Sequence, residues 1–296
     1  MNILSCIGNT PLIKINADNE KDADIFVKIE SFNAGGSIKS RVAVQMIEDA
    51  EKIGLLKPGA TIIEPTGGNT GLGLALVSTL KNYNFLAVVP DNYSKKRIEL
   101  LRLYNANVIL SDSKKGNDSH IELCKSIIEQ NPSYICLNQF TNQSCIYAHY
   151  SGTASEIIKS ITPDAFVACV GSSGTFTGIG KRLKHENNKI KLFVAQPKGC
   201  DILTGKSISH SIQGVSLGII PPLLEYSLID GVIDVEQNDV KQELRKLLKN
   251  QGLFLGASSG ANIVAARMVA HKLGKGKIVC TVAPDGGQYY VDDFYK

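Results

Sequence analysis

The chain has 296 residues, 43% of them hydrophobic, and a formal net charge of +4 from 32 basic and 28 acidic side chains. This length fits one large or two medium domains. The mild charge argues against nucleic-acid binding, and the absence of an eighteen-residue apolar run argues against a membrane span. The seven cysteines form no C-x-x-C pair, and the five histidines show no H-E-x-x-H spacing. Because scattered thiols in apolar runs fit a reducing compartment, we expect a cytoplasmic protein without disulfides or a metal site.

Short apolar runs alternate with amphipathic segments along the chain. We predict strands at residues 24–29, 61–64, 85–90, 107–110, 165–170, 191–195 and 277–282. We predict helices at residues 41–53, 70–81, 95–104, 120–130, 146–161, 175–185, 240–251 and 261–273. This alternation predicts an α/β fold with mostly parallel sheets covered by helices on both faces. Ligands of such folds bind at the carboxyl ends of the strands.

A lysine follows two glycines where the first helix is predicted to begin, in Gly35-Gly36-Ser37-Ile38-Lys39-Ser40-Arg41. Ser37 is a reasonable N-cap for that helix. The positive end of a helix dipole disfavours a second cation, so the position lowers the pKa of Lys39. A lysine with a lowered pKa suits Schiff-base chemistry. A surface lysine after a glycine turn is the alternative at this point.

Two further segments contain polar or glycine-rich loops beside predicted helices. Residues 64–71 follow a predicted strand and open a helix, so their backbone N–H groups could bind a phosphate or a carboxylate. A plain strand-to-helix turn is the alternative. Gln139 lies in the segment 138–142 and by itself is an ordinary loop residue. His149, in the helix that follows, we interpret as structural.

Two later turns have the same strand-to-helix character. In residues 171–178, small residues and hydroxyls favour an anion site, and the absence of a G-K-[ST] ending excludes a nucleotide P-loop. Ser258, in residues 255–261, is by itself better explained as an N-cap of the helix at 261–273.

These five segments, in this order, resemble the cysteine synthase and cystathionine β-synthase family, fold type II enzymes that use pyridoxal 5′-phosphate (PLP) and are similar to the tryptophan synthase β chain. The resemblance runs from residues 7–12 to residues 284–287. It implies two three-layer α/β/α domains with PLP in the cleft between them. The smaller, mobile domain would span residues 36–145, and the larger one residues 1–35 plus 146–296. The resemblance also implies a homodimer, with no nucleic acid or membrane as partner.

The resemblance assigns roles to individual residues. Lys39 would hold PLP and act as the catalytic base, Asn69 would contact the 3′-oxygen, and Ser258 would face the pyridine nitrogen. The other predicted cofactor residues are Gly171, Ser172, Ser173, Gly174 and Thr175. The predicted substrate residues are Thr66, Gly67, Gly68, Thr70 and Gln139.

The chain also departs from the family motifs. Ser40 replaces an aspartate, which puts the pKa of Lys39 in question. Gly67 replaces a serine, which removes a hydrogen bond worth roughly 0.5–1.5 kcal/mol and is expected to leave room near the substrate. A serine, Ser173, replaces a glycine of the phosphate loop and must tilt the loop or use its new hydroxyl. The loop at the cleft mouth is altered at Ser216, Leu217 and Ile219.

The implied reaction is β-replacement on an activated serine through an α-aminoacrylate intermediate, with a small amino acid and a small nucleophile as substrates. Cysteine synthase, which joins O-acetylserine and sulfide, is the leading interpretation. A serine at the ring nitrogen, unlike an aspartate, leaves the ring uncharged and favours elimination at Cβ. Alternatives are O-phosphoserine with an amine giving a diaminopropionate precursor, cystathionine β-synthase, and a cysteine lyase that releases sulfide. A non-catalytic PLP-fold sensor or partner subunit is the alternative from another class.

Overall fold

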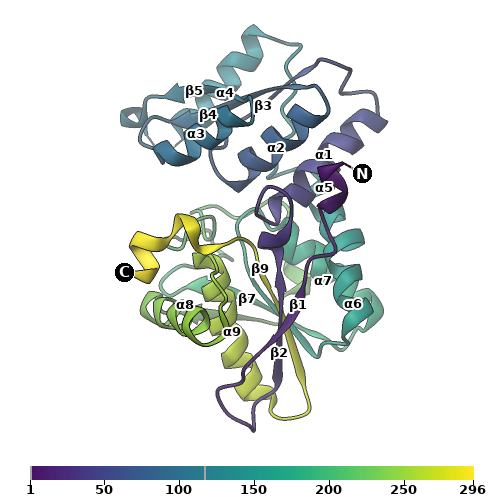
Figure 1. Ribbon diagram of the computed structural model, residues 1–296, viewed down its shortest axis with the longest axis vertical. Helices are drawn as coiled ribbons and strands as arrows, with labels where there is room; N and C mark the ends of the chain where they lie inside the picture. Colours follow the sequence, from purple (N-terminus) through teal and green to yellow (C-terminus); the bar gives the residue numbers. More distant parts are fainter. Residues whose placement is uncertain (1, 117) are drawn as a thin grey trace.

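The structure is a computed structural model that describes residues 2–116 and 118–296, and it confirms the α/β architecture (Figure 1). A six-stranded sheet has the order β1-β2-β9-β6-β7-β8, and a three-stranded sheet has the order β3-β4-β5. The strands are β1 Leu12–Ile15, β2 Asp24–Ile29, β3 Thr61–Glu64, β4 Asn84–Pro90, β5 Asn107–Ser111, β6 Ala165–Cys169, β7 Lys191–Pro197, β8 Gly231–Val235 and β9 Ile278–Ala283. All neighbours pair in parallel except β1 and β2.

Helices cover both faces of the larger sheet (Figure 1). The helices of the chain are α1 Lys39–Lys52, α2 Asn69–Leu80, α3 Lys95–Leu103, α4 Ser119–Gln130, α5 Ser144–Tyr147, α6 Ala154–Ser160, α7 Gly174–Glu186, α8 Gln237–Gln251 and α9 Ala257–Leu273. Apolar side chains of α8 and α9 form one buried cluster with the sheet, and those of α6 and α7 form another. This three-layer arrangement explains why β6 is apolar throughout, since both of its faces are buried.

The smaller sheet also lies between two layers of helices. Side chains of α1, α2 and α3 pack with β3 and β4 in one cluster, and α4 contributes to a second cluster with the same strands. Every strand of this sheet falls within residues 36–145, and every strand of the larger sheet falls outside that range. The domain boundaries themselves stay a prediction.

The predicted elements differ from the observed ones mainly at the two edge strands of the larger sheet and in one helix. The strand list omitted β1 and β8, which lie at the two edges of the larger sheet and are only partly buried. Each is only four or five residues long and carries one charged residue, Lys14 or Asp234, among apolar ones. The predicted helix 146–161 is three pieces, with a π-helix, Ala148–Thr153, between α5 and α6.

Strands β3, β6 and β9 end where the loops of the candidate site begin. Within the described part of the chain, no helix is long and apolar enough to cross a membrane. Among the same residues, no three His, Cys, Asp or Glu side chains gather in a way that could hold a metal ion. All seven cysteines are free thiols, four of them buried.

Candidate active site

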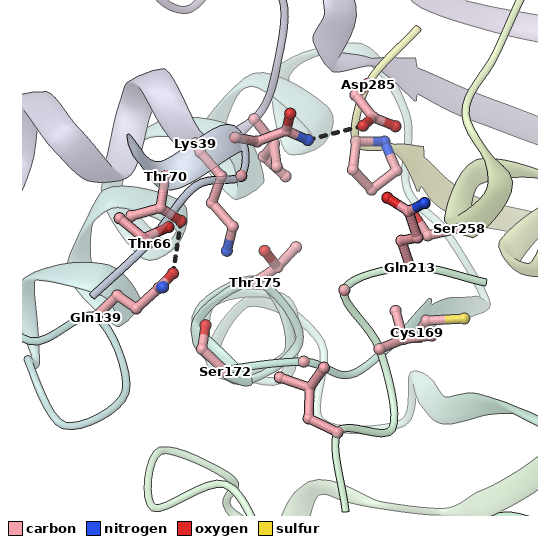
Figure 2. A pocket seen from close by; sticks show the side chains of 18 of the residues that line it. Lys39, Thr66, Thr70, Gln139, Cys169, Ser172, Thr175, Gln213, Ser258 and Asp285 are labelled. Atoms are coloured by element: carbon pink, nitrogen blue, oxygen red, sulfur yellow. Dashed lines mark hydrogen bonds between the residues drawn. The ribbon is translucent and has the colours of Figure 1, made fainter. Parts of the chain in front are cut away.

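Lys39 is the first residue of α1, and its amine points into a cavity of about 320 Å³ (Figure 2). The segment before it is tied to the larger sheet, because the Ile38 N–H donates to the Pro284 carbonyl at 2.8 Å. The Lys39 N–H donates to the Ser37 hydroxyl at 3.3 Å, although Ile38 rather than the predicted Ser37 occupies the N-cap position. The pKa of Lys39 is lowered, as predicted, but burial is the main cause.

Ser40 shapes the glycine turn before the helix. Its buried hydroxyl donates to the Ala34 carbonyl at 2.5 Å. A Cβ on Gly35 would lie 2.7 Å from Ser40 Oγ, and Gly35 has a φ of +87°. Glycine is therefore required there both by the backbone conformation and by the close approach of the serine.

The loop between β3 and α2 brings four predicted substrate residues to one wall of the cavity. Thr66, Gly67, Gly68 and Thr70 all line it, and Gly68 is the N-cap of α2. The first N–H groups of a helix have no intrahelical partner, so this wall can bind an anion such as a carboxylate.

The free space that we expected beside Gly67 does not exist, so that part of the prediction was wrong. A Cβ on Gly67 would lie 2.7 Å from Val89 Cγ1 and 2.8 Å from Tyr93 Cε1. The ring of Tyr93 and the side chain of Val89 occupy the volume that a serine would need.

Gln139 reaches the same wall from a separate loop. The Thr70 hydroxyl donates to Gln139 Oε1 at 2.6 Å (Figure 2), which leaves the amide NH₂ as the end that can meet a carboxylate. Glu64, at the end of β3, holds this loop by accepting the N–H groups of Asn138 and Gln139, both at 3.0 Å. Burial raises the pKa of Glu64. Sequence reasoning missed this role, although a glutamate closing an apolar strand was a visible signal.

The loop after β6 forms the opposite wall. Of residues 171–175, only Gly174 does not line the cavity. Gly174 packs behind the wall, where a Cβ would lie 2.9 Å from Cys145 Cβ. A Cβ on Gly171 would lie 2.2 Å from the Gly214 carbonyl oxygen, so glycine lets the loop at residues 213–217 approach.

Sequence reasoning left open whether Ser173 tilts the phosphate loop or uses its new hydroxyl. It adopts a left-handed conformation with φ 73° at the N-cap of α7, and its Oγ lies 3.0 Å from Thr177 Oγ1. The new hydroxyl is thus turned into the helix. The hydroxyls of Ser172 and Thr175 remain at the cavity wall (Figure 2).

His149 does not line the cavity, but it contacts Thr175, which does. Its Nε2 lies 3.2 Å from Thr175 Oγ1, and its Nδ1 lies 2.9 Å from Thr153 Oγ1. The imidazole is fully buried, and burial lowers its pKa well below the ordinary value, so the ring is neutral. The structural interpretation of His149 agrees with these contacts, but sequence reasoning did not find its link to Thr175.

Ser258 lines the cavity at the second position of α9. The helix begins at Ala257 with Gly256 as its N-cap, so an N-cap role for Ser258 was wrong. One turn further along, Asn262 Oδ1 accepts the Cys169 N–H at 2.6 Å and joins α9 to the end of β6.

Asp285 is a cavity residue to which sequence reasoning gave no role. It is 2% exposed, and its Oδ2 accepts the Asn69 side-chain amide at 2.7 Å (Figure 2). The same oxygen accepts the Tyr290 hydroxyl at 2.8 Å. Asn69 in turn accepts from Arg97 at 3.3 Å. A Cβ on Gly256 would lie 1.9 Å from Asp285 Oδ1, so glycine is required there by the carboxylate. Burial raises the pKa of Asp285.

An outer groove of about 1230 Å³ adjoins the cavity and shares several residues with it. Leu217 lines both spaces and Ser216 lines the groove, as expected for the cleft mouth. Ser216 has a φ of 47°, and its N–H donates to the Val170 carbonyl at 3.0 Å. Ile219 is exposed and lies outside the residues that line either space.

Known proteins match this chain closely. The family described as pyridoxal-phosphate dependent enzyme matches residues 3–285. A cysteine synthase of Staphylococcus aureus is 39% identical over 295 residues, which cover 98% of this chain and 95% of that protein. The chain belongs to the PLP-dependent cysteine synthase and cystathionine β-synthase family.

Two solved structures show how similar the fold of this family member is to others. A hydrogen sulfide-producing enzyme from Fusobacterium nucleatum has a TM-score of 0.93 at 38% identity, covering 98% of this chain and 97% of that one. An O-ureido-L-serine synthase has a TM-score of 0.93 at 33% identity, covering 99% and 93%. The chain is therefore a fold type II PLP enzyme, and its chemistry is β-replacement.

The cavity of this family member fits the cofactor. The Lys39 amine lies on one side, and the hydroxyls of Ser172 and Thr175 lie on another, at the N-terminus of a 13-residue helix that suits a phosphate. The Ser258 hydroxyl is a third polar group. The volume of about 320 Å³ is at the lower end of the roughly 300–1,000 Å³ of small-molecule sites. The individual contacts to PLP stay predictions.

Proposed function

We propose that this enzyme is a cysteine synthase, which replaces the acetate group of O-acetylserine with sulfide. The observation that carries the proposal is the position of Lys39 between two walls that can each bind an anion. One wall, at the start of α2, suits the substrate carboxylate, and the other, at the start of α7, suits the cofactor phosphate. The substrate Cα is then placed near the lysine.

Lys39 is the proton carrier in this proposal. It is the only lysine among the described residues that line the cavity. Because burial lowers its pKa, more of the amine is neutral and can accept the α-proton and later return it. Bound PLP supplies the electron sink that makes this proton acidic.

The carboxylate wall orients the substrate and helps to exclude water. The hydrogen bond from Thr70 fixes the Gln139 amide, so its NH₂ can join the N–H groups of residues 66–70. These groups belong to the smaller sheet and its loops, whereas Ser172 and Ser258 belong to the larger part. Substrate held by both sides would draw the walls together and protect the reacting atoms from hydrolysis.

A neutral partner at the ring nitrogen favours elimination over transamination. Ser258 is the group that we assign there. Asp285 lines the same cavity, but its Oδ2 is already engaged by Asn69 and Tyr290. Its Oδ1 packs against Gly256, where a Cβ would lie 1.9 Å away, so we assign the Ser258 hydroxyl rather than this carboxylate to the ring nitrogen.

The donor and the nucleophile can be identified by offering O-acetylserine, O-phosphoserine, serine and cysteine in turn, with and without sulfide. Mass spectrometry identifies the amino acid that is made. We expect the highest kcat/KM for cysteine formation from O-acetylserine and sulfide, and no turnover by Lys39→Ala. A larger kcat/KM for O-phosphoserine, or a product that lacks sulfur, would overturn the assignment.

A second candidate is the release of sulfide from cysteine. It is favoured by the 38% identity and full-length match to a hydrogen sulfide-producing enzyme. Cysteine offered alone tests it, because sulfide release at a kcat/KM above that of cysteine formation would make the lyase the main activity.

Three expectations from the sequence complete the proposal. We infer a mobile domain at residues 36–145 against a larger domain of residues 1–35 plus 146–296, a homodimer, and a cytoplasmic location. Sedimentation of the purified protein measures the oligomeric state, and a monomer at micromolar concentration would contradict the homodimer.

A further inference from the structure

Gly67 and Tyr93 occupy one volume beside the carboxylate wall. The backbone of Gly67 does not have a positive φ, so its conformation does not require glycine. What requires glycine is the contact, since a Cβ would lie 2.8 Å and 2.9 Å from two ring carbons of Tyr93 and 2.7 Å from Val89. The absence of a serine from this loop therefore accompanies the close packing of both Tyr93 and Val89 against Gly67.

The phenol hydroxyl lies over the same loop. A Cβ on the next residue, Gly68, would be 3.4 Å from Tyr93 Oη and 3.8 Å from Arg97 Nη1. Tyr93 is half-buried and lines both the cavity and the outer groove, so it stands where substrate passes from one to the other. Its N–H donates to the Pro90 carbonyl at 3.0 Å, which fixes the residue at the end of β4.

We propose that Tyr93 is a specificity-determining residue that donates a hydrogen bond to an α-amino-acid substrate in place of the serine hydroxyl absent at Gly67. The inference rests on the proposed function, because it takes the loop at residues 66–70 as the site of the substrate carboxylate. The phenol also narrows the passage between cavity and groove. The substrate class is therefore a small α-amino acid with a free carboxylate.

The test uses the PLP-loaded enzyme and L-alanine, which has a carboxylate but no leaving group. Binding is followed by the change in cofactor absorbance, KM is measured with the best donor, and the thermal midpoint reports stability. In Tyr93→Phe we expect the Kd for alanine and the donor KM to rise at least about tenfold, as for loss of a hydrogen bond to a charged group. The thermal midpoint should stay within about 2 °C. Tyr147→Phe, at an exposed position outside the cavity, is the matched control and should change nothing.

The shared volume is tested by a double-mutant cycle. Gly67→Ser should lower the thermal midpoint and raise the Kd for alanine, because its side chain collides with the ring. Gly67→Ser combined with Tyr93→Ala should recover the part of both losses that the ring causes, whereas the 2.7 Å contact with Val89 remains, so the two effects are not additive. Additive effects, a wild-type Kd in Tyr93→Phe, or no binding of alanine by the wild type would each overturn the inference. If alanine binds as expected but no donor is turned over, the proposed function fails while the role of Tyr93 stands.

Discussion

At the scale of single residues, the site holds side chains in positions that other contacts must stabilise. Ser173 is the clearest case, since a non-glycine residue in the left-handed region costs roughly 1–2 kcal/mol. Its hydroxyl contact with Thr177, at 3.0 Å, offsets part of this cost, because a net hydrogen bond contributes about 0.5–1.5 kcal/mol. The two terms nearly cancel, so the serine is tolerated where the resembled motif has glycine.

Ser173→Gly should therefore change the free energy of unfolding by less than about 1 kcal/mol. It should also leave the affinity of the apo-protein for PLP within threefold, because the serine hydroxyl faces the helix. Ser172→Ala and Thr175→Ala, whose hydroxyls line the cavity, should weaken PLP binding more strongly. Titration of the apo-variants with PLP measures this, and a large loss of affinity in Ser173→Gly would show that its hydroxyl meets the phosphate.

At the scale of elements, the glycines of α7 decide how close the helix comes to its neighbours. A Cβ on Gly178 would lie 2.3 Å from the Ile146 carbonyl oxygen and 2.8 Å from His149 Cβ. This contact seats α7 against the segment α5 and the π-helix, and the π-helix turns His149 toward Thr175. The position of the phosphate wall thus depends on a helix packing contact behind it.

Gly178→Ala should destabilise the protein by about 1–3 kcal/mol, since overpacking outweighs the higher helix propensity of alanine. It should also weaken PLP binding by displacing His149. Gly180→Ala on the same helix is the matched control, because its nearest obstacle is a Leu192 methyl group at 3.0 Å that can move. Urea unfolding of both variants measures the difference, and equal midpoints would contradict the packing argument.

At the scale of the whole molecule, a buried charge cluster fastens α1, and with it Lys39, to the larger sheet. Arg41 donates to Glu30 at 2.7 Å and to Glu156 at 2.6 Å, and Lys28 lies 2.7 Å from Glu156. Burial alone would raise the pKa of Glu156, but the hydrogen bonds from Arg41 and Lys28 outweigh it and lower the pKa to about 2. Asp285 and Asn69 make a second link between the two parts, across the cavity.

The lowered pKa of Glu156 predicts a stability loss in acid. The carboxylate contributes fully above its unfolded pKa of about 4.5, and the contribution is lost as the pH falls through the folded pKa of about 2. The pKa difference corresponds to roughly 3 kcal/mol at most, and solvent screening of this half-buried carboxylate reduces the contribution. Glu156→Gln should be less stable at pH 7 and should lose less stability than the wild type between pH 4.5 and pH 2.

Urea midpoints over this pH range measure the difference between the two proteins, so that titration of the other carboxylates cancels. Glu99→Gln, at an exposed position on α3, is the control and should follow the wild type. A pH dependence in Glu156→Gln equal to that of the wild type would mean that Glu156 does not titrate in this way.

The sequence by itself determined the order of the elements, the α/β class and the loops that meet at the cavity. Apolar runs, glycine turns and helix starts are encoded within short windows, which singled out Lys39, residues 66–70 and residues 171–175, whereas Ser258 was assigned to the site by the family resemblance. Edge strands β1 and β8 were missed although most of their residues are apolar, because so short an apolar run does not by itself identify a strand.

The tertiary structure alone decided which distant residues share a contact. Asn69 and Asp285 are 216 positions apart, and Thr175 and His149 lie on different elements, so no local pattern joins them. The same holds for Tyr93, which fills the space beside Gly67 and reversed an expectation of free room. The physical reason is that a backbone pattern specifies a strand or a turn, whereas the volume around one atom is set by whichever side chains the fold packs against it.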